Sequence, residues 1–271
     1  MTRTAFTFIL SILLLFKSIG QDKIQWINAK KLETAGIYQN LGLTKGEKNI
    51  GLIFENDSNF SKELILKLNN PHINYIYLYR KNGDTIYQTG DHKQFNTRPI
   101  IFWDFALPII VEKNRVDSLV LSVNKAGENL TYFLEILTPE EFDNIKTRDT
   151  FMYGMVLSFS IFFTLIFLIL GIIKNQVPNI IFSVFIVISA FSILNSAGLG
   201  FQFLWPSFPW IQNFSRTLFA GLSMVAFIQY MYTVQKKKSR KKHKKIFKIL
   251  HGILHFEGNL HYVQPRNFLL R

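Results

Sequence analysis

The chain has 271 residues with 31 Lys and Arg against 18 Asp and Glu, which gives a formal net charge of +13 at pH 7. Hydrophobic residues make up 48% and aromatic residues 15% of the sequence, which excludes a disordered chain because such chains are poor in aromatic residues. There is no cysteine, so a disulfide scaffold, a thiolate zinc site and a cysteine nucleophile are excluded.

The positive charge is concentrated at one end of the chain. Residues 21–150 contain 16 basic and 17 acidic residues, whereas residues 236–271 contain 11 basic residues and one acidic residue. The first segment therefore has no basic groove for nucleic acid, and the second has no folded module around its charges. We expect no nucleic-acid partner and relate the excess charge to a membrane surface.

Residues 1–20 have the layout of a secretory signal peptide. Arg3 precedes an apolar stretch from Ala5 to Phe16, and the small residues Ser18 and Gly20 follow. The stretch is shorter than the roughly 20 residues that span a bilayer. We expect export with cleavage after Gly20; the alternatives are an uncleaved anchor and a buried helix.

Residues 21–148 alternate between apolar and polar side chains. Leu64, Leu66 and Leu68 alternate with their neighbours, and the same period of two recurs at residues 75–79 and 118–123. Such alternation predicts half-buried strands, and turn residues such as Asn82-Gly83 separate them. With residues 84–88, 99–111 and 130–137 added, we predict about eight short strands in an all-β, jelly-roll-like sandwich.

Three tyrosines of this segment are candidate ligand-binding residues. Tyr75, Tyr77 and Tyr79 fall on one face of a strand, opposite Ile76 and Leu78. In one interpretation they form an aromatic platform on which a sugar or another flat ligand stacks. In the other, which is the commoner case, they are ordinary strand residues that pack beneath a loop or against the membrane. Trp103 is a further candidate and is equally ambiguous.

The exported segment shows no catalytic pattern. His72 and His92 are its only histidines, and neither has metal-ligand spacing. A Gly-x-Ser-x-Gly motif and a phosphate-binding glycine loop are both missing from it. We therefore predict that the protein is not an enzyme and expect no catalytic residue, no cofactor and no metal site.

Residues 150–235 predict three transmembrane helices. Thr150 to Ile173 are 24 residues without a charge, and residues 175–215 are another 41, which is too long for one helix of about 20–25 residues. Two prolines and two tryptophans interrupt the second stretch at Trp205-Pro206-Ser207-Phe208-Pro209-Trp210. The predicted spans are therefore about 150–173, 179–204 and 211–232.

The flanking residues predict the orientation of these helices. Trp205, Pro206, Trp210 and Arg216 are expected at the outer membrane interface, with Arg216 reaching the head groups. Eight basic residues follow the third span and predict a cytoplasmic tail, residues 236–271, beside an anionic inner leaflet. They are Lys236, Lys237, Lys238, Arg240, Lys241, Lys242, Lys244 and Lys245. Within the spans, Asn195, Gln202 and Gln229 are expected to hydrogen-bond between helices or to line a signal-transmitting bundle.

The order of these segments resembles the 7TMR-DISM family, the bacterial seven-transmembrane receptors with diverse intracellular signalling modules. The similarity lies in residues 73–79, Gly83, Gly90, Arg98-Pro99 and residues 105–108 of the sandwich. In the helices it lies in Gly198-Leu199-Gly200-Phe201-Gln202-Phe203-Leu204-Trp205-Pro206. Together these segments cover roughly residues 45–235.

The resemblance implies a receptor-like sensor in a bacterial inner membrane. Its outer jelly roll would bind a small ligand, for example a carbohydrate, and its helices would relay binding inward to a downstream signalling protein. Three of seven helices and no output module are recognisable in this sequence. A truncated or frameshifted receptor and a membrane-anchored binding or adhesion module therefore remain alternatives.

Overall fold

The computed structural model describes residues 25–29, 36–44, 46–125 and 127–256, with side chains as far as Lys236. The expected signal peptide, residues 1–20, lies outside the described residues. The chain divides into two compact units. The first comprises residues up to Leu157 together with Phe191–Phe219, and the second comprises Ser158–Ala190 and the chain from Ala220 onward.

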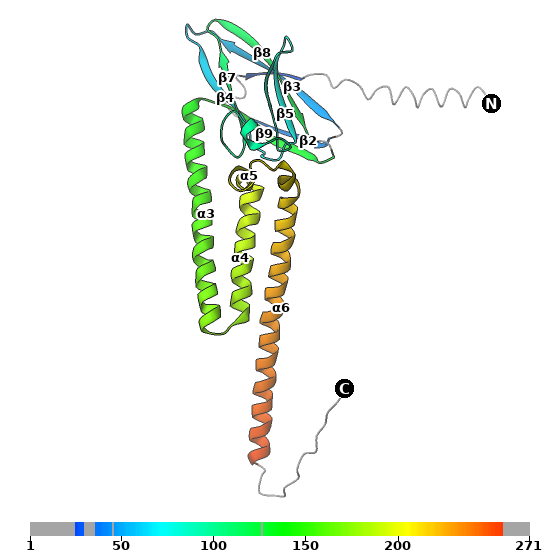
Figure 1. Cartoon of the computed structure of the whole chain (residues 1–271), viewed down its shortest axis with the longest axis vertical. Helices are drawn as coiled ribbons and strands as arrows, with labels where there is room; N and C mark the ends of the chain where they lie inside the picture. Colours follow the sequence, from blue (N-terminus) through cyan, green and yellow to red (C-terminus); the bar gives the residue numbers. More distant parts are fainter. Residues whose placement is uncertain (1–24, 30–35, 45, 126, 257–271) are drawn as a thin grey trace, which may run out of the picture. The chain divides into compact units, whose positions relative to one another are not determined.

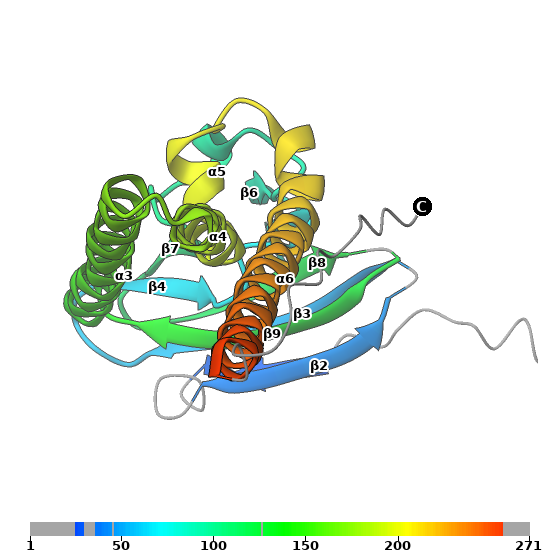
Figure 2. The same ribbon diagram turned by 90° about the horizontal axis from the view of Figure 1, so that it is seen from below.

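The first unit contains a sandwich of two sheets, as the sequence predicts (Figure 1). The described residues form a five-stranded sheet in the order β1-β3-β8-β5-β6 and a four-stranded sheet in the order β2-β9-β4-β7. Figure 2 shows β3 alongside β8, which pair antiparallel over ten residues. The strands are β1 (Gln25–Asn28), β2 (Ile37–Leu43), β3 (Glu47–Asn56), β4 (Lys62–Leu68), β5 (Tyr75–Arg80), β6 (Thr85–Thr89), β7 (Phe105–Val111), β8 (Arg115–Asn124) and β9 (Asn129–Leu137).

The hydrophobic core lies between the two sheets. Alternate side chains of each strand point inward and are fully buried, among them Leu52 of β3, Leu78 of β5, Leu121 of β8 and Leu66 of β4. This is the period-two pattern that the sequence contains, and the burial of apolar side chains on one face of each sheet holds the sheets together.

The strand β4 is buried on both faces, which corrects the expectation of a half-buried strand. Every residue from Leu64 to Leu68 is buried. Ile65 belongs to a second apolar cluster that includes Phe142 and Leu199 from helical segments, and Lys67 pairs with Glu135 at 3.0 Å. The outward face of the four-stranded sheet is therefore covered along β4 within the first unit. The predicted strand over residues 99–111 is also shorter than expected, because it begins only at Phe105.

The helix α3 (Pro139–Ile173) contains the first predicted span but begins eleven residues earlier than Thr150. A capping box at Thr138 and Glu141 starts it: the Glu141 carboxylate accepts hydrogen bonds from the Thr138 backbone N–H at 2.8 Å and its hydroxyl at 2.9 Å. The expected domain boundary near residue 148 thus falls inside a continuous helix.

The second predicted span is divided. The helix α4 (Val177–Ser196) ends before Gly198, and the short helix α5 (Leu199–Phe203) follows. Gly198 has a φ of +83°, a conformation that disfavours residues with a Cβ. A Cβ at Gly198 would also lie 2.6 Å from a carbon of Pro71 and 3.0 Å from the Trp103 carbonyl oxygen. The helix breaks here because the chain turns sharply while touching a loop of the sandwich.

The third span belongs to a much longer helix than predicted. The helix α6 (Pro209–Phe256) continues for 48 residues and includes the basic stretch, because Lys and Arg are good helix formers and no Gly or Pro lies between Gly221 and Gly252. Among the described residues, three helices are long and apolar enough to cross a membrane: Pro139–Ile173, Val177–Ser196 and Pro209–Lys236.

The second unit contains parts of these three helices, and aromatic rings connect them. The Phe182 ring of α4 lies 4.6 Å from that of Phe167 in α3 and 4.8 Å from that of Tyr230 in α6. Phe185 of α4 and Phe227 of α6 are 5.4 Å apart. Many of the phenylalanines thus pack between helices.

Candidate functional site

The three candidate tyrosines lie on the outward face of the five-stranded sheet. Ile76 and Leu78 are fully buried, whereas Tyr75, Tyr77 and Tyr79 are partly exposed. The rings of Tyr77 and Tyr79 are nearly parallel, at 4° with centroids 6.0 Å apart, and Tyr75 packs edge-on against His92 at 5.4 Å. The sheet thus holds the three rings in one row.

The register of the sheet adds a tryptophan to this face. Trp26 of β1 pairs with Gly51 of β3, Gly51 pairs with Val120 of β8, and Val120 pairs with Tyr79. A Cβ at Gly51 would lie 2.4 Å from the Trp26 ring, so only glycine leaves room for the indole. Trp26 is 42% exposed, and the Lys81 ammonium lies 5.9 Å from its ring centre.

Polar side chains accompany the aromatic ones. Ser122 and Gln88 flank Tyr77 on the neighbouring strands, and Asn124 pairs with both Tyr75 and Glu47. Burial is the main cause of a raised pKa of Tyr79, and the negative charge of the Glu47 carboxylate raises it further. The phenol of Tyr79 therefore stays protonated at neutral pH. Rings combined with amide, hydroxyl and carboxylate groups suit a ligand that has both flat faces and hydroxyl groups. We call Trp26, Tyr75, Tyr77 and Tyr79 the aromatic face.

The fourth candidate, Trp103, does not lie on the aromatic face. It is only 6% exposed and belongs to the apolar cluster against the four-stranded sheet. Its ring packs against Phe102 at 4.2 Å and edge-on against Tyr153 of α3 at 5.5 Å. The structure therefore separates Trp103 from the three tyrosines.

The neighbouring Arg98 organises the loop that contains Trp103. Its buried guanidinium donates hydrogen bonds to the carbonyl oxygens of Phe102 at 3.1 Å and of Trp103, and it stacks over Phe105 at 4.0 Å. Burial lowers the pKa of Arg98 to about 9, and burial raises the pKa of Asp104 to about 7. The Arg98 guanidinium offsets part of its own burial cost because it donates to several carbonyl groups of the loop at once.

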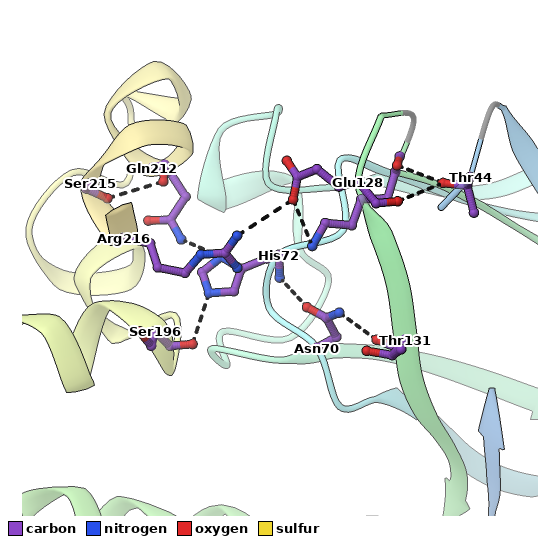
Figure 3. A network of polar contacts seen from close by, with 10 residues as sticks. Thr44, Asn70, His72, Glu128, Thr131, Ser196, Gln212, Ser215 and Arg216 are labelled. Carbon is purple, nitrogen blue, oxygen red and sulfur yellow. Dashed lines mark hydrogen bonds and ion pairs between the residues drawn. The ribbon is translucent and has the colours of Figure 1, made fainter. Parts of the chain in front are cut away.

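A second candidate region joins the sandwich to the ends of α4 and α6 (Figure 3). His72, from a sandwich loop, is 8% exposed. Its Nε2 lies 2.9 Å from the Ser196 carbonyl oxygen, and its Nδ1 lies 3.2 Å from Nε2 of Gln212. We call His72, Ser196 and Gln212 the histidine contact.

The partners determine the protonation of the histidine contact. The Ser196 carbonyl can only accept, so His72 Nε2 carries the proton and donates it. Gln212 accepts from the Trp205 indole N–H at 3.0 Å through its Oε1, so its amide NH₂ faces His72 and donates to Nδ1. Burial lowers the pKa of His72 to about 4. A proton on Nδ1 would place two donors against each other, so the contact requires neutral His72.

An ion pair lies beside the histidine contact. Arg216 of α6 is 3.6 Å from the Glu128 carboxylate, which also pairs with Lys125 at 3.3 Å. The sequence predicts Arg216 at the membrane interface, and in the structure its guanidinium pairs with a carboxylate of the sandwich. Asn195 of α4 donates to the Ser215 hydroxyl of α6 at 2.9 Å, which confirms the expected hydrogen bond between helices.

The predicted interface residues lie in and around this region. The Pro206 carbonyl oxygen accepts a hydrogen bond from the Phe95 backbone N–H at 2.8 Å, and Phe95 packs edge-on against Phe201 of α5 at 5.5 Å. Trp210 is 62% exposed and stacks on Phe214. Of the basic stretch, Lys236 lies 5.8 Å from the Tyr232 ring; the side chains of Lys237, Lys238, Arg240, Lys241, Lys242, Lys244 and Lys245 lie outside the described part.

Sequence reasoning missed the residues that make the histidine contact, and it missed Trp26. His72 and Gln212 are 140 positions apart, and no local pattern connects them. The position of His72 in the sequence raises only the question of metal binding, for which its spacing is unsuitable. Within the described residues, no group of three or more His, Cys, Asp and Glu side chains could hold a metal ion.

The fold and these contacts define a class of protein, a receptor-like membrane protein with a β-sandwich domain attached to membrane-spanning helices. Two family models match the chain: 7TMR-DISM extracellular 2 over residues 26–140, and 7TM diverse intracellular signalling over residues 149–260. The chain belongs to the 7TMR-DISM family, as its sequence predicts.

The remaining comparisons are sparse. No curated protein matches the chain. Among solved structures, the pre-peptidase C-terminal domain of collagenase from Bacillus anthracis is similar, with 12% sequence identity over 43% of this chain and 97% of that one, at a TM-score of 0.29.

Proposed function

We propose that this protein is a membrane sensor that binds a small ligand on the aromatic face and passes the bound state to its helices through the histidine contact. The observation that carries the proposal is the direct bonding of a sandwich loop to two helices, since His72 bonds with both Ser196 of α4 and Gln212 of α6. If the helices served only to anchor the sandwich in the membrane, no such buried polar junction would be needed. Burying polar groups is costly unless they are all paired.

The ligand of the aromatic face is a carbohydrate or a similarly hydroxylated ring compound. Trp26, Tyr77 and Tyr79 offer apolar ring faces to such a molecule, and Gln88 and Glu47 offer hydrogen bonds to its hydroxyl groups. The protein itself is not catalytic. Its output is a contact with a downstream signalling protein.

The proposed setting is a bacterial inner membrane with the sandwich outside. Residues 1–20 direct export, and the basic stretch from Lys236 to Lys245 stays in the cytoplasm beside anionic lipids. A reporter fused after Lys245 should therefore be active only in the cytoplasm, and activity outside would refute this orientation.

The ligand proposal is best tested on the full chain in nanodiscs. Leu199 of the helical part covers the sandwich residues Ile65 and Trp103, so a fragment ending near residue 148 would expose apolar side chains. Binding to an oligosaccharide array should fall about tenfold or more in Tyr77→Ala, the loss expected when a central interface aromatic is truncated. Tyr38→Ala is the matched control, since Tyr38 is exposed on the other sheet.

Relay is tested by hydrogen exchange on the same samples. A bound oligosaccharide should change amide exchange in residues 193–216, around Ser196 and Gln212. If the oligosaccharide binds without changing amide exchange in residues 193–216, the protein is a membrane-anchored binding module and not a relay. If Tyr77→Ala and wild type bind equally well, the aromatic face is not the binding site.

A further inference from the structure

An apolar cavity of about 620 Å³ lies beside the covered sheet, and all of its lining residues belong to the first unit. The loop before β7, the start of α3 and the segment from α4 through α5 enclose it. Its walls include Trp103, Tyr153, Gly154, Asn195, Gln202 and Trp205. The volume lies within the range of about 300–1,000 Å³ that is typical of small-molecule sites.

Exposed apolar residues surround the cavity. Ile101 is 68%, Phe203 69% and Leu204 55% exposed, and all three line it. Phe203 and Leu204 directly precede the Trp205-Pro206 turn, between the helices Val177–Ser196 and Pro209–Lys236 that can span a membrane. The cavity can therefore receive a molecule from the lipid phase.

Two residues of the lining each have a buried acceptor atom that meets no hydrogen-bond partner in the part of the chain that the structure describes. Asn195 is 1% exposed, and its Oδ1 is unpaired although its Nδ2 donates to Ser215. The Oε1 of Gln202 is buried and unpaired as well. A buried polar atom without a hydrogen bond costs free energy, and an oxygen acceptor can be satisfied only by a donor.

We propose that this cavity binds an acyl-chain amphiphile whose head group carries hydroxyl groups, of the monoacylglycerol type. The chain fills the apolar space between Trp103, Tyr153 and Trp205, and the hydroxyl groups donate to Asn195 Oδ1 and Gln202 Oε1. Among the described residues of the lining the one charged side chain is that of Lys146, so a cationic head group is disfavoured. This site is distinct from the aromatic face, and either proposal can fail without the other.

Tryptophan fluorescence of the full chain in a non-ionic detergent provides the test. In a Trp26→Phe, Trp210→Phe background, the remaining indoles are Trp103 and Trp205, and both line the cavity. A monoacylglycerol with a brominated chain should quench them saturably. The brominated fatty acid methyl ester, which has no hydroxyl group, and a brominated alkyltrimethylammonium should need at least about tenfold higher concentrations.

Two variants test the contribution of the head group and that of the acyl chain to binding separately. Gln202→Met keeps the side-chain length but removes the acceptor, and it should reduce the preference for the monoacylglycerol several-fold. A Cβ at Gly154 meets nothing within 4 Å, so Gly154→Leu should fold normally and fill the cavity, which abolishes saturable quenching by every probe. Gln229→Met and Gly221→Leu, outside the lining, are the matched controls.

Three results would overturn the proposal. They are equal quenching by the monoacylglycerol and the methyl ester, unchanged quenching in Gly154→Leu, and no saturable quenching of the wild-type indoles.

Discussion

Replacing His72 with Phe should loosen the junction between the sandwich and the helices. Phe preserves the ring volume but removes both ring nitrogens. The Ser196 carbonyl oxygen then loses a donor at 2.9 Å, and the Gln212 amide loses an acceptor at 3.2 Å. The Gln212 amide stays buried, because Gln212 is 2% exposed, whereas Ser196 is an exposed residue whose carbonyl oxygen costs less to leave without a donor.

The size of the effect follows from the buried Gln212 amide. A buried polar group without a partner costs about 1–3 kcal/mol, so the junction should weaken by about 1 kcal/mol at the low end. Since about 1.4 kcal/mol is tenfold in an equilibrium constant, the open form of the junction should become at least about fivefold more populated.

Hydrogen exchange of the full chain in nanodiscs measures this population. Within residues 197–204, the Gly198 amide bonds with the Asn195 carbonyl and the Leu204 amide with that of Gly200. These amides should exchange at least about fivefold faster in His72→Phe, provided that exchange follows the opening equilibrium. Amides in the core strand β8 should not change.

His92→Phe is the matched control. His92 is the other histidine of the sandwich, and it packs against Tyr75 rather than against a helix. If residues 197–204 exchange at the same rate in His72→Phe, His92→Phe and wild type, then the histidine contact does not hold the junction and the reasoning is wrong.

Three further predictions concern charge. Burial lowers the pKa of His72 to about 4, whereas an unfolded histidine titrates near 6.5. The closed junction should therefore gain stability as pH rises from about 4 to 6.5. Amide exchange of residues 197–204 should show this pH dependence in wild type and not in His72→Phe. Burial raises the pKa of Asp104 to about 7, so this carboxyl stabilises the fold below its unfolded pKa near 4, and that stability is lost as pH rises to about 7. Asp104→Asn should therefore raise the unfolding free energy at pH 8 by about 1–4 kcal/mol and have much less effect at pH 4 in thermal melts; an equal shift at both pH values would contradict this assignment. Arg216 and Glu128 are both partly exposed, so Arg216→Gln should weaken the junction by no more than about 1 kcal/mol and should lose even this effect in 0.5 M salt, by the same exchange assay.

Several features of the fold were predictable from the sequence because they depend on near neighbours. The period of two around Leu66 and Leu121 predicts strands with one inward face, and both side chains are fully buried. The uncharged stretch from Thr150 to Ile173 predicts a spanning helix, and α3 contains it. The placement of Tyr75, Tyr77 and Tyr79 on one face follows from strand geometry alone.

Helix ends were less predictable, because capping and close approach determine them. The start of α3 depends on the capping box at Thr138, which lies outside the apolar span. The break after α4 depends on Gly198, whose backbone conformation and contact with Pro71 arise only where the loop and the helix meet.

The candidate sites depend on contacts between residues that are distant in sequence. Trp26 lies on the aromatic face only because β1 pairs in parallel with β3. Trp103 does not lie there, because its loop folds against the opposite sheet. His72 meets Gln212 across 140 residues. By itself, the sequence determined which segments are strands, which helices can enter a membrane and where the charge lies, because these properties depend on the composition and period of each segment. Only the tertiary structure decided which side chains share a face, a cavity or a junction, because that depends on strand register and on where the chain turns back on itself.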